Sequence, residues 1–183
     1  MSSLFDALRE KRGGLAQRWA ELVFATYPAQ SAPFLSREKD RFRNPLGATI
    51  RDELAAIVDV LLDGGGAEAV AGPLDAIVRV RAVQGFAPAE ALGFVFQLKR
   101  AVAELVGRDA AAAAAAELLE LHARIDELAL QAFAIYVGCR ERIFELRARE
   151  ATARTYSLLK RAGALTQTDA AEGTPTPSGE GRS

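Results

Sequence analysis

Apolar side chains recur at the spacing of an α-helix along most of the chain, and the apolar–polar alternation of a β-strand is almost absent. The stretch from Ile50 to Leu61 is typical, because its apolar residues stand three or four positions apart and so share one helix face. Half of the 183 residues are apolar, enough for one domain to bury a core without metals or disulfides. These features predict an all-α helical bundle.

Capping residues, glycines and prolines predict where the helices begin and end. Asn44 and Pro45 form a good helix start, because Asn caps the first backbone amides and Pro fits the first turn. Pro28 and the glycines at 64–66 are stop signals. Helices are expected over residues 4–27, with Gly13-Gly14 as the place for a kink, and over residues 45–63, 73–83, 88–106 and 110–161, with a connector over residues 29–45.

The last expected helix is the longest, roughly 75 Å at 1.5 Å per residue, which exceeds the size of such a domain. Its first part is apolar around much of its circumference and should cross the core. Beyond Cys139 it becomes charged, with seven basic and three acidic side chains in residues 140–161, so it pairs with its own copy or extends from the core. We expect a core domain at residues 1–139, a continuous charged helix at 140–162 and a disordered tail at 163–183.

The composition argues against several classes of protein. One Cys and one His rule out an intrachain disulfide, a Cys-based zinc site and a His-cluster metal site. The 23 basic and 24 acidic side chains lack the basic footprint of a nucleic-acid-binding protein. The longest uncharged apolar window, Leu128 to Cys139, falls short of the about 20 residues that a membrane span needs. We expect a cytoplasmic protein without a signal peptide, a membrane span or a nucleic-acid partner.

The sequence holds no recognisable catalytic arrangement. His122 and Cys139 form the one pair of the Cys–His kind, but one helix would hold them roughly 25 Å apart. No enzyme activity, metal or cofactor is therefore expected. Haem is the alternative, because an all-α chain can use a single His as the axial ligand, with Asp126 one turn later to orient the imidazole. The other interpretation of His122 is a surface or half-buried side chain that is hydrogen-bonded to Asp126.

Two charged segments supply candidate binding residues. Residues 38–47 surround Phe42 with charge and lead into a capped helix start, so they form either a solvated turn anchored by that aromatic ring or a loop that recognises an anion. The segment from Arg79 to Phe86 places more polar groups at a helix end, where internal caps and salt bridges are the alternative to ligand contacts. The candidate ligand or partner residues are Arg41, Asn44, Arg81, Gln84, Lys99, Arg140 and Glu141, the last two where the long helix leaves the core.

Several phrases, in order, are similar to those of a known family. They are Arg18-Trp19 with Thr26-Tyr27-Pro28, residues 38–47, Arg81-Ala-Val-Gln84 before Pro88, Gly93-Phe-Val-Phe-Gln-Leu-Lys99, Arg124-Ile-Asp126, Ala132-Phe-Ala-Ile-Tyr136 and Cys139-Arg-Glu141. Together they resemble the RsbRD N-terminal domain family, the sensor domain of RsbR-type stressosome proteins. The resemblance runs from about residue 10 to residue 160.

The resemblance implies a globin-like bundle without haem, usually dimeric, whose last helix leads into a STAS domain that captures a kinase. Because this sequence ends shortly after the charged helix, it resembles the stand-alone form of the family, which also occurs beside dissimilatory sulfite reductase genes. We expect a non-enzymatic, stressosome-like sensor for signal transduction, a globin-like homodimer that binds an unidentified protein partner or ligand. The alternatives are a haem-binding globin-like sensor that uses His122 and an accessory factor that docks to a sulfur-redox complex.

Overall fold

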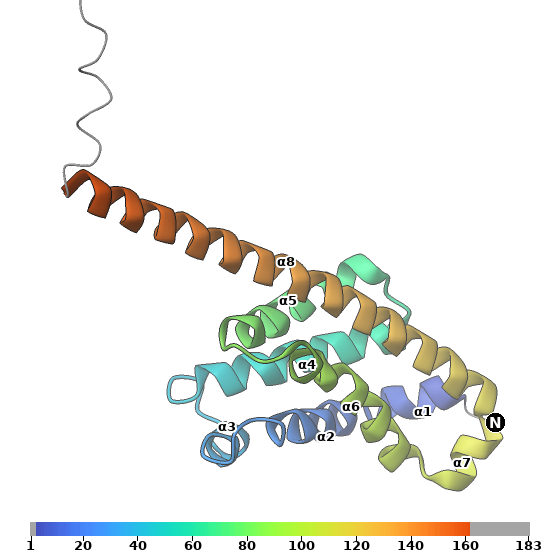
Figure 1. Ribbon diagram of the computed structural model, residues 1–183. Helices are drawn as coiled ribbons and strands as arrows, with labels where there is room; N and C mark the ends of the chain where they lie inside the picture. The colour runs from blue at the N-terminus through green and yellow to red at the C-terminus, as the bar shows by residue number, and fades with distance from the viewer. Residues whose placement is uncertain (1–2, 162–183) are drawn as a thin grey trace, which may run out of the picture. The chain divides into compact units, whose positions relative to one another are not determined.

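The computed structural model describes residues 3–161, without the side chains of residues 67 and 108–110. All regular structure in this range is helical and ends in one long helix, which confirms the all-α prediction (Figure 1). The helices are α1 Leu4–Glu10, α2 Arg12–Phe24, α3 Ala32–Arg37, α4 Pro45–Asp63, α5 Ala67–Val83, α6 Pro88–Val106, α7 Arg108–Ala113 and α8 Ala115–Arg161. The chain divides into two compact units between Glu141 and Arg142, both of which belong to α8.

The core of the first unit lies among α2, α4, α5 and α6. Helix α2 packs against α4 and α6, and α4 also packs against α5. Trp19 of α2 is fully buried, and its ring stacks on Phe94 of α6 with 6.2 Å between the centroids. Its indole N–H donates to the Phe94 carbonyl oxygen at 2.7 Å, so this large buried side chain leaves no polar atom without a partner.

Helix α8 joins this core through one buried stripe. Its buried residues stand three or four positions apart, as one helix face requires: Leu121, Ile125, Leu128, Ala132, Tyr136 and Cys139. Arg124 also donates to the carbonyl oxygen of Leu61 at 2.8 Å, and Arg9 of α1 donates to that of Leu62 at 2.7 Å. Because cations favour the carboxyl end of a helix, these contacts hold α1 and α8 at the end of α4, where Gly64 has a φ of 77° that suits glycine.

The first expected helix is two helices, so its predicted kink and end are wrong. The break falls at Lys11, while Gly13 and Gly14 stay inside α2, which ends at Phe24. Ser3 caps α1, its hydroxyl accepting from the amide of Asp6 at 3.2 Å. The break lets Arg9 reach the last carbonyls of α4, a tertiary contact that has no signal in the local sequence.

Three other boundaries also differ from the prediction. The connector contains α3, and α5 begins at Ala67 with Pro73 inside it. Val70 is buried one turn before Leu74, so packing offsets the backbone hydrogen bond that Pro73 cannot donate. A turn at Ala114 separates α7 from α8, so the run of alanines does not open one continuous helix.

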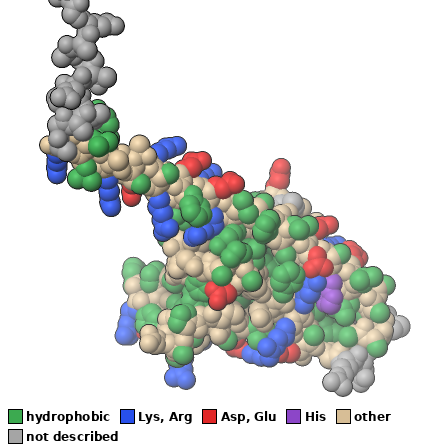
Figure 2. Space-filling model, in the orientation of Figure 1, with side chains coloured by type: hydrophobic (Ala, Val, Ile, Leu, Met, Phe, Trp, Pro, Cys, Tyr) green, Lys and Arg blue, Asp and Glu red, His purple; other side chains and the backbone are tan. Residues whose placement is uncertain are grey.

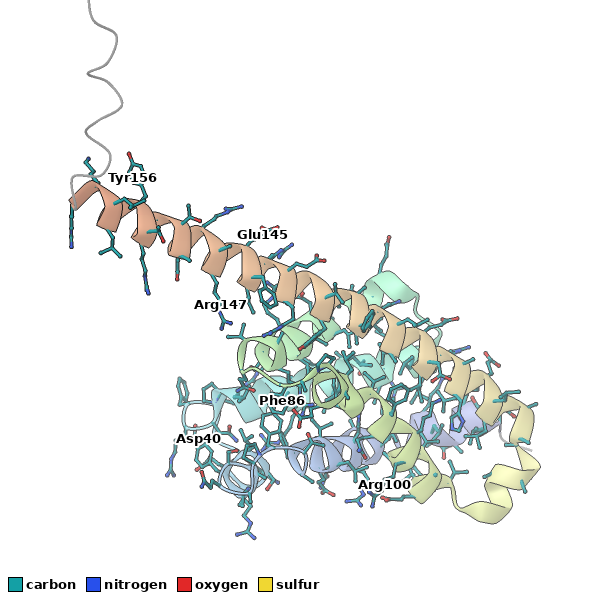
Figure 3. All side chains as sticks on the ribbon, viewed as in Figure 1. Asp40, Phe86, Arg100, Glu145, Arg147 and Tyr156 are labelled. Atoms are coloured by element: carbon teal, nitrogen blue, oxygen red, sulfur yellow. The ribbon has the colours of Figure 1, made fainter. Side chains whose placement is uncertain are left out.

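The second unit is described over residues 142–161, which are helical throughout. Its side chains are exposed except for the half-buried Ile143. Figure 3 shows Glu145, Arg147 and Tyr156 extending outward from this part of α8. The predicted disordered tail lies outside the described residues.

Candidate functional site

Arg81, near the end of α5, is the most unusual buried group in the described part of the chain. Its side chain has no exposed surface, although a guanidinium stays charged throughout the physiological pH range. No ion pair with a carboxylate compensates it among the described residues. Burying a charge without such a partner is costly, so we take Arg81 as the centre of the candidate site.

Two directed hydrogen bonds hold the guanidinium between three helices. Nη1 donates to the carbonyl oxygen of Glu90 in the first turn of α6 at 2.9 Å. Nη2 donates to Oγ1 of Thr26, just beyond α2, at 2.7 Å. The same Thr26 hydroxyl donates to the carbonyl oxygen of Val23 at 2.6 Å. Arg81 therefore connects the end of α2, its own helix α5 and the start of α6.

Three aromatic rings surround the guanidinium where a carboxylate would be expected. The guanidinium carbon lies 4.9 Å from the ring centroid of Tyr27, 5.1 Å from that of Phe86 and 5.4 Å from that of Phe94. A cation over such a ring gains about 2 kcal/mol when it is desolvated. We call Arg81 and these three aromatic residues the arginine cage.

The arginine cage leaves two buried polar atoms without hydrogen-bond partners among the described residues. They are Nε of Arg81 and the hydroxyl oxygen of Tyr27. Each such atom costs about 1–3 kcal/mol, and incomplete satisfaction of this kind is typical of functional positions. A guanidinium keeps its proton, so Arg81 can hold or orient a polar group but cannot act as a general acid or base.

Phe86 connects the arginine cage to α8. It lies in the turn between α5 and α6, next to Gly85, whose φ of 83° suits glycine. The Phe86 ring lies on Arg81, and its carbonyl oxygen accepts a hydrogen bond of 2.9 Å from the Tyr136 hydroxyl. Phe86 is labelled in Figure 3, between α5 and α6. A displacement of Arg81 can therefore reach α8 through a single residue.

Asn44 is a structural residue in the loop before α4. It is buried, and its Oδ1 accepts from the amide of Gly47 at 2.9 Å, which confirms the predicted helix cap. Its amide nitrogen donates to the carbonyl oxygens of Leu35 at 3.1 Å and Glu38 at 2.9 Å. Every polar group of this side chain is thus used in holding the loop to α3 and α4.

The charged loop itself is not anchored by its aromatic residue. Phe42 is 98% exposed, because Asp40 accepts its backbone amide at 2.8 Å and so forms a tight turn that directs the ring outward. Arg41 is also exposed and pairs with Asp52 of α4 at 2.5 Å. Of the two interpretations of this loop, the turn anchored by Phe42 is therefore wrong. Arg41 is held by a surface ion pair.

Lys99 and His122 lie near each other without forming the expected His–Asp hydrogen bond. Asp126 instead accepts from the Lys99 ammonium at 2.6 Å. Burial of the half-buried imidazole, together with the nearby Lys99 charge, lowers the pKa of His122, while Asp126 opposes the shift. The lowered pKa keeps His122 neutral at pH 7. Figure 2 shows that charged side chains are exposed on the same molecule.

The candidate residues do not form one cluster. Gln84 is the exposed residue that follows α5. Arg140 is half-buried and Glu141 is exposed, and both lie at the end of the first unit. No hydrogen bond or ion pair joins any two of the first five candidates among the described residues: Arg41, Asn44, Arg81, Gln84 and Lys99. The sequence predicted that these residues form one polar cluster, but they lie in three separate places: the loop before α4, the end of α5, and Lys99 in α6. Only the surroundings of Arg81 are unusual.

Sequence reasoning missed the residues that surround Arg81. Thr26 and Tyr136 touch the site through contacts that span 55 and 50 positions, and such distances leave no periodic signal. The aromatic residues Tyr27, Phe86 and Phe94 carry no local feature that would distinguish them from ordinary core residues. An arginine on the apolar face of a predicted helix was the one signal that could have indicated them.

The described residues contain no group of three or more His, Cys, Asp or Glu side chains placed to hold a metal ion, and none of their helices is both long and apolar enough to cross a membrane. Fold and site thus define an all-α protein with a buried, caged arginine at the junction of three helices.

Residues 13–167 match the family model of the RsbT co-antagonist protein rsbRD N-terminal domain. The chain belongs to this family of stressosome-type sensor and regulatory domains, as its sequence phrases indicated. No curated protein and no solved structure matches it.

Proposed function

We propose that this chain is a non-enzymatic, cytoplasmic sensor module that acts by binding a partner protein or a ligand through a globin-like homodimer. The observation that carries the proposal is the connection from Arg81 through Phe86 to Tyr136. It joins the interior of the first unit to α8. A signal that displaces the guanidinium would change the support of Tyr136 and so reposition α8.

The continuity of α8 supports a function without catalysis. His122 and Cys139 both lie in this uninterrupted helix, which holds them roughly 25 Å apart at 1.5 Å per residue. Neither can activate the other at that distance. Arg81, the buried charge of the candidate site, cannot transfer a proton.

A second apolar face of α8 supports the dimer. Within the first unit, Leu119, Leu130 and Phe133 are 71%, 71% and 52% exposed, and their spacings of 11 and 3 positions place them on one face. Phe96 of α6 is another exposed ring. Figure 2 shows hydrophobic side chains open to solvent on the first unit. Exposed apolar patches mark interaction sites, and we assign this one to a second copy of the chain.

The partner surface is proposed to be the charged part of α8. The family description names a co-antagonist of RsbT, so action through a protein partner agrees with family membership. Residues 140–161, beginning with Arg140 and Glu141, carry seven basic and three acidic side chains. A partner with an acidic surface would complement this surplus and associate faster because of it.

Affinity capture with the chain as bait, in its wild-type form and with basic side chains of α8 replaced by acidic ones, tests whether residues 140–161 bind the partner. The wild-type chain should retain a specific protein that the double variant Arg147→Glu, Arg154→Glu loses, because both side chains are exposed and basic. The matched control, Arg147→Lys with Arg154→Lys, keeps the charge and should retain the protein. Capture that survives charge reversal would contradict the assignment, and subunits of a sulfur-redox complex among the captured proteins would favour the accessory-factor alternative.

The haem alternative is decided by an absorption spectrum. The lowered pKa of His122 keeps the imidazole neutral, the form that binds iron. If the chain is a haem sensor, adding haem gives a Soret band that His122→Ala abolishes. We expect no such band.

A further inference from the structure

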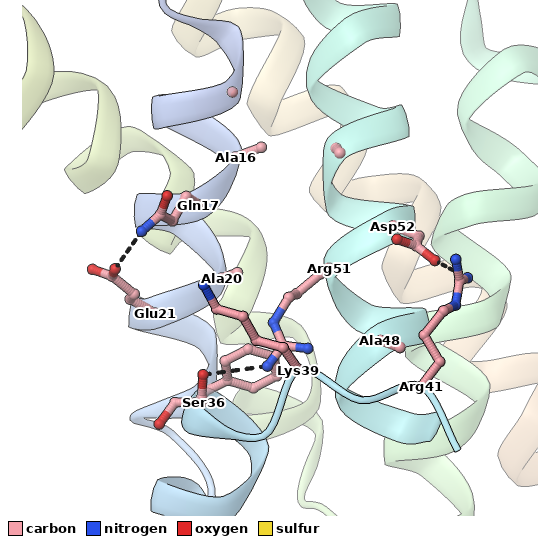
Figure 4. Close-up of a pocket in the computed structure, with 13 residues that line it drawn as sticks. Ala16, Gln17, Ala20, Glu21, Ser36, Lys39, Arg41, Ala48, Arg51 and Asp52 are labelled. Atoms are coloured by element: carbon pink, nitrogen blue, oxygen red, sulfur yellow. Dashed lines mark hydrogen bonds and ion pairs between the residues drawn. The ribbon is translucent and has the colours of Figure 1, made fainter. Parts of the chain in front are cut away.

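A cleft of about 550 Å³ lies between α2 and α4, beside the loop that joins α3 to α4 (Figure 4). This volume is in the range of small-molecule sites. Its floor is open because the residues there are small: Gly13, Ala16 and Ala20 from α2, and Ala48 and Ala55 from α4. The buried ring of Phe24 adds an aromatic surface to the same floor.

Two cations that line the cleft, Lys39 and Arg51, have no carboxylate partner among the described residues, whereas the two carboxylates that line it already form ion pairs. Asp52 binds Arg41 at 2.5 Å, and Glu21 binds Arg18, outside the cleft, at 2.9 Å. The remaining charged lining residues are Lys39 and Arg51. Neither forms an ion pair among the described residues. The cleft therefore has an apolar floor and a surplus of positive charge.

Arg51 is fixed in position over the floor. Its Nη2 donates to the carbonyl oxygens of Leu35 at 2.6 Å and Glu38 at 3.1 Å, at the end of α3. Its guanidinium carbon lies 5.2 Å from the ring centroid of Phe24. Nε and Nη1 have no hydrogen-bond partner in the described part of the chain. These donors are pre-organised, so a ligand would lose little free energy in ordering them.

We propose that this cleft binds a small amphipathic organic anion, a carboxylate joined to an apolar body. The carboxylate would contact Lys39 and Arg51, and the apolar body would lie on the alanines and on Phe24. The inference rests on the proposed sensor function and names the class of ligand. Phe24 is the last residue of α2, two positions before Thr26, which holds Arg81. Occupation of the cleft would therefore act on the same end of α2 that supports the arginine cage.

Titration calorimetry of the full chain with 4-phenylbutyrate tests the ligand class. Two comparators separate its parts: 4-phenylbutanol keeps the apolar body without the charge, and acetate keeps the charge without the body. We expect 4-phenylbutyrate to bind at least about tenfold more tightly than either, because a charge-assisted contact and apolar burial each contribute.

Two variants with matched controls test the location. Lys39→Gln should raise the dissociation constant about tenfold, whereas Arg43→Gln removes an exposed cation of the same loop that does not line the cleft and should have no effect. Ala55→Leu fills the floor and should abolish binding. Ala56→Leu, at the next and likewise half-buried position of α4 outside the cleft, should not. Thermal unfolding checks that each variant is folded.

The proposal is overturned if 4-phenylbutyrate does not bind, if either comparator binds equally well, or if Lys39→Gln and Ala55→Leu leave the affinity unchanged. These failures are distinguishable from failure of the proposed function. A chain that still dimerises and captures its partner would keep the sensor role and lose only this ligand site.

Discussion

The hydroxyl of Tyr136 donates a hydrogen bond of 2.9 Å to the carbonyl oxygen of Phe86, fifty positions earlier in the chain. The ring of the same Phe86 lies on the guanidinium of Arg81. One residue therefore connects the long helix to a buried charge. The proposed relay depends on this connection.

Tyr136→Phe removes the hydrogen bond and keeps the ring. We expect the free energy of unfolding to fall by about 1 kcal/mol, measured by urea denaturation. Amide hydrogen exchange should become faster both in the turn at residues 84–87 and in α8 near residue 136, because each loses its support. Tyr156→Phe, at an exposed position of the second unit, is the control. Faster exchange on only one side of the bond would argue against the relay.

Substitutions of Arg81 separate the effect of its charge on the unfolding free energy from the effect of its shape. Arg81→Ala leaves a cavity among three rings and should cost about 3–5 kcal/mol in unfolding free energy. Arg81→Met fills the space without a buried charge and should cost far less. Arg81→Lys keeps the charge but loses the planar stacking and the two directed donors, so it should be less stable than Arg81→Met. The opposite order would show that the charge itself stabilises the fold.

Gly47 is required by the cap of α4. A Cβ at this position would overlap the side chain of Asn44, which accepts the Gly47 amide and holds the preceding loop. Gly47→Ala should therefore lower the unfolding free energy by about 1–3 kcal/mol. Gly93→Ala, inside α6 with open space around it, should raise it by about 0.5–1 kcal/mol. Equal effects of the two variants in urea denaturation would contradict the assigned cap.

The lowered pKa of His122 predicts that the stability of the folded chain depends on pH. Its pKa is lower in the folded chain than the ordinary value of 6.5, so the unfolded chain binds a proton more readily between the two values. Stability should be fully present above pH 6.5 and fall as the pH drops from there to the folded pKa. His122→Gln should flatten this part of the profile measured by thermal unfolding. An NMR titration that places the folded pKa at or above 6.5 would refute the assignment.

The sequence predicted the fold class because helix periodicity and capping are local signals. The start of α4 is an example, since Asn44 and Pro45 carry its cap in adjacent positions. The break at Lys11 was not predictable in this way, because it accompanies a contact of Arg9 with α4 that has no local sequence signal. The continuation of α5 through Pro73 likewise depends on core packing of Val70.

The candidate site was predictable only in part. Arg81 stood out as an arginine at a helix end, and it is the centre of the site. Its surroundings were hidden, because Thr26 and Tyr27 lie just beyond α2 and Tyr136 lies in α8, and these segments come together only after folding. Lys39 and Arg51 gave no signal of their own, since what distinguishes them is that the neighbouring carboxylates are already paired.

The second apolar face of α8 carries the proposed homodimer, the assembly through which the sensor module is proposed to act. Light scattering coupled to size-exclusion chromatography directly measures the mass of the assembly in solution. At tens of micromolar, the wild-type chain should have twice the mass of one 19.6 kDa chain. The double variant Leu130→Glu, Phe133→Glu should have the mass of a single chain with unchanged helix content. A single-chain mass for the wild type, or a dimer that persists in the variant, would contradict the proposed assembly.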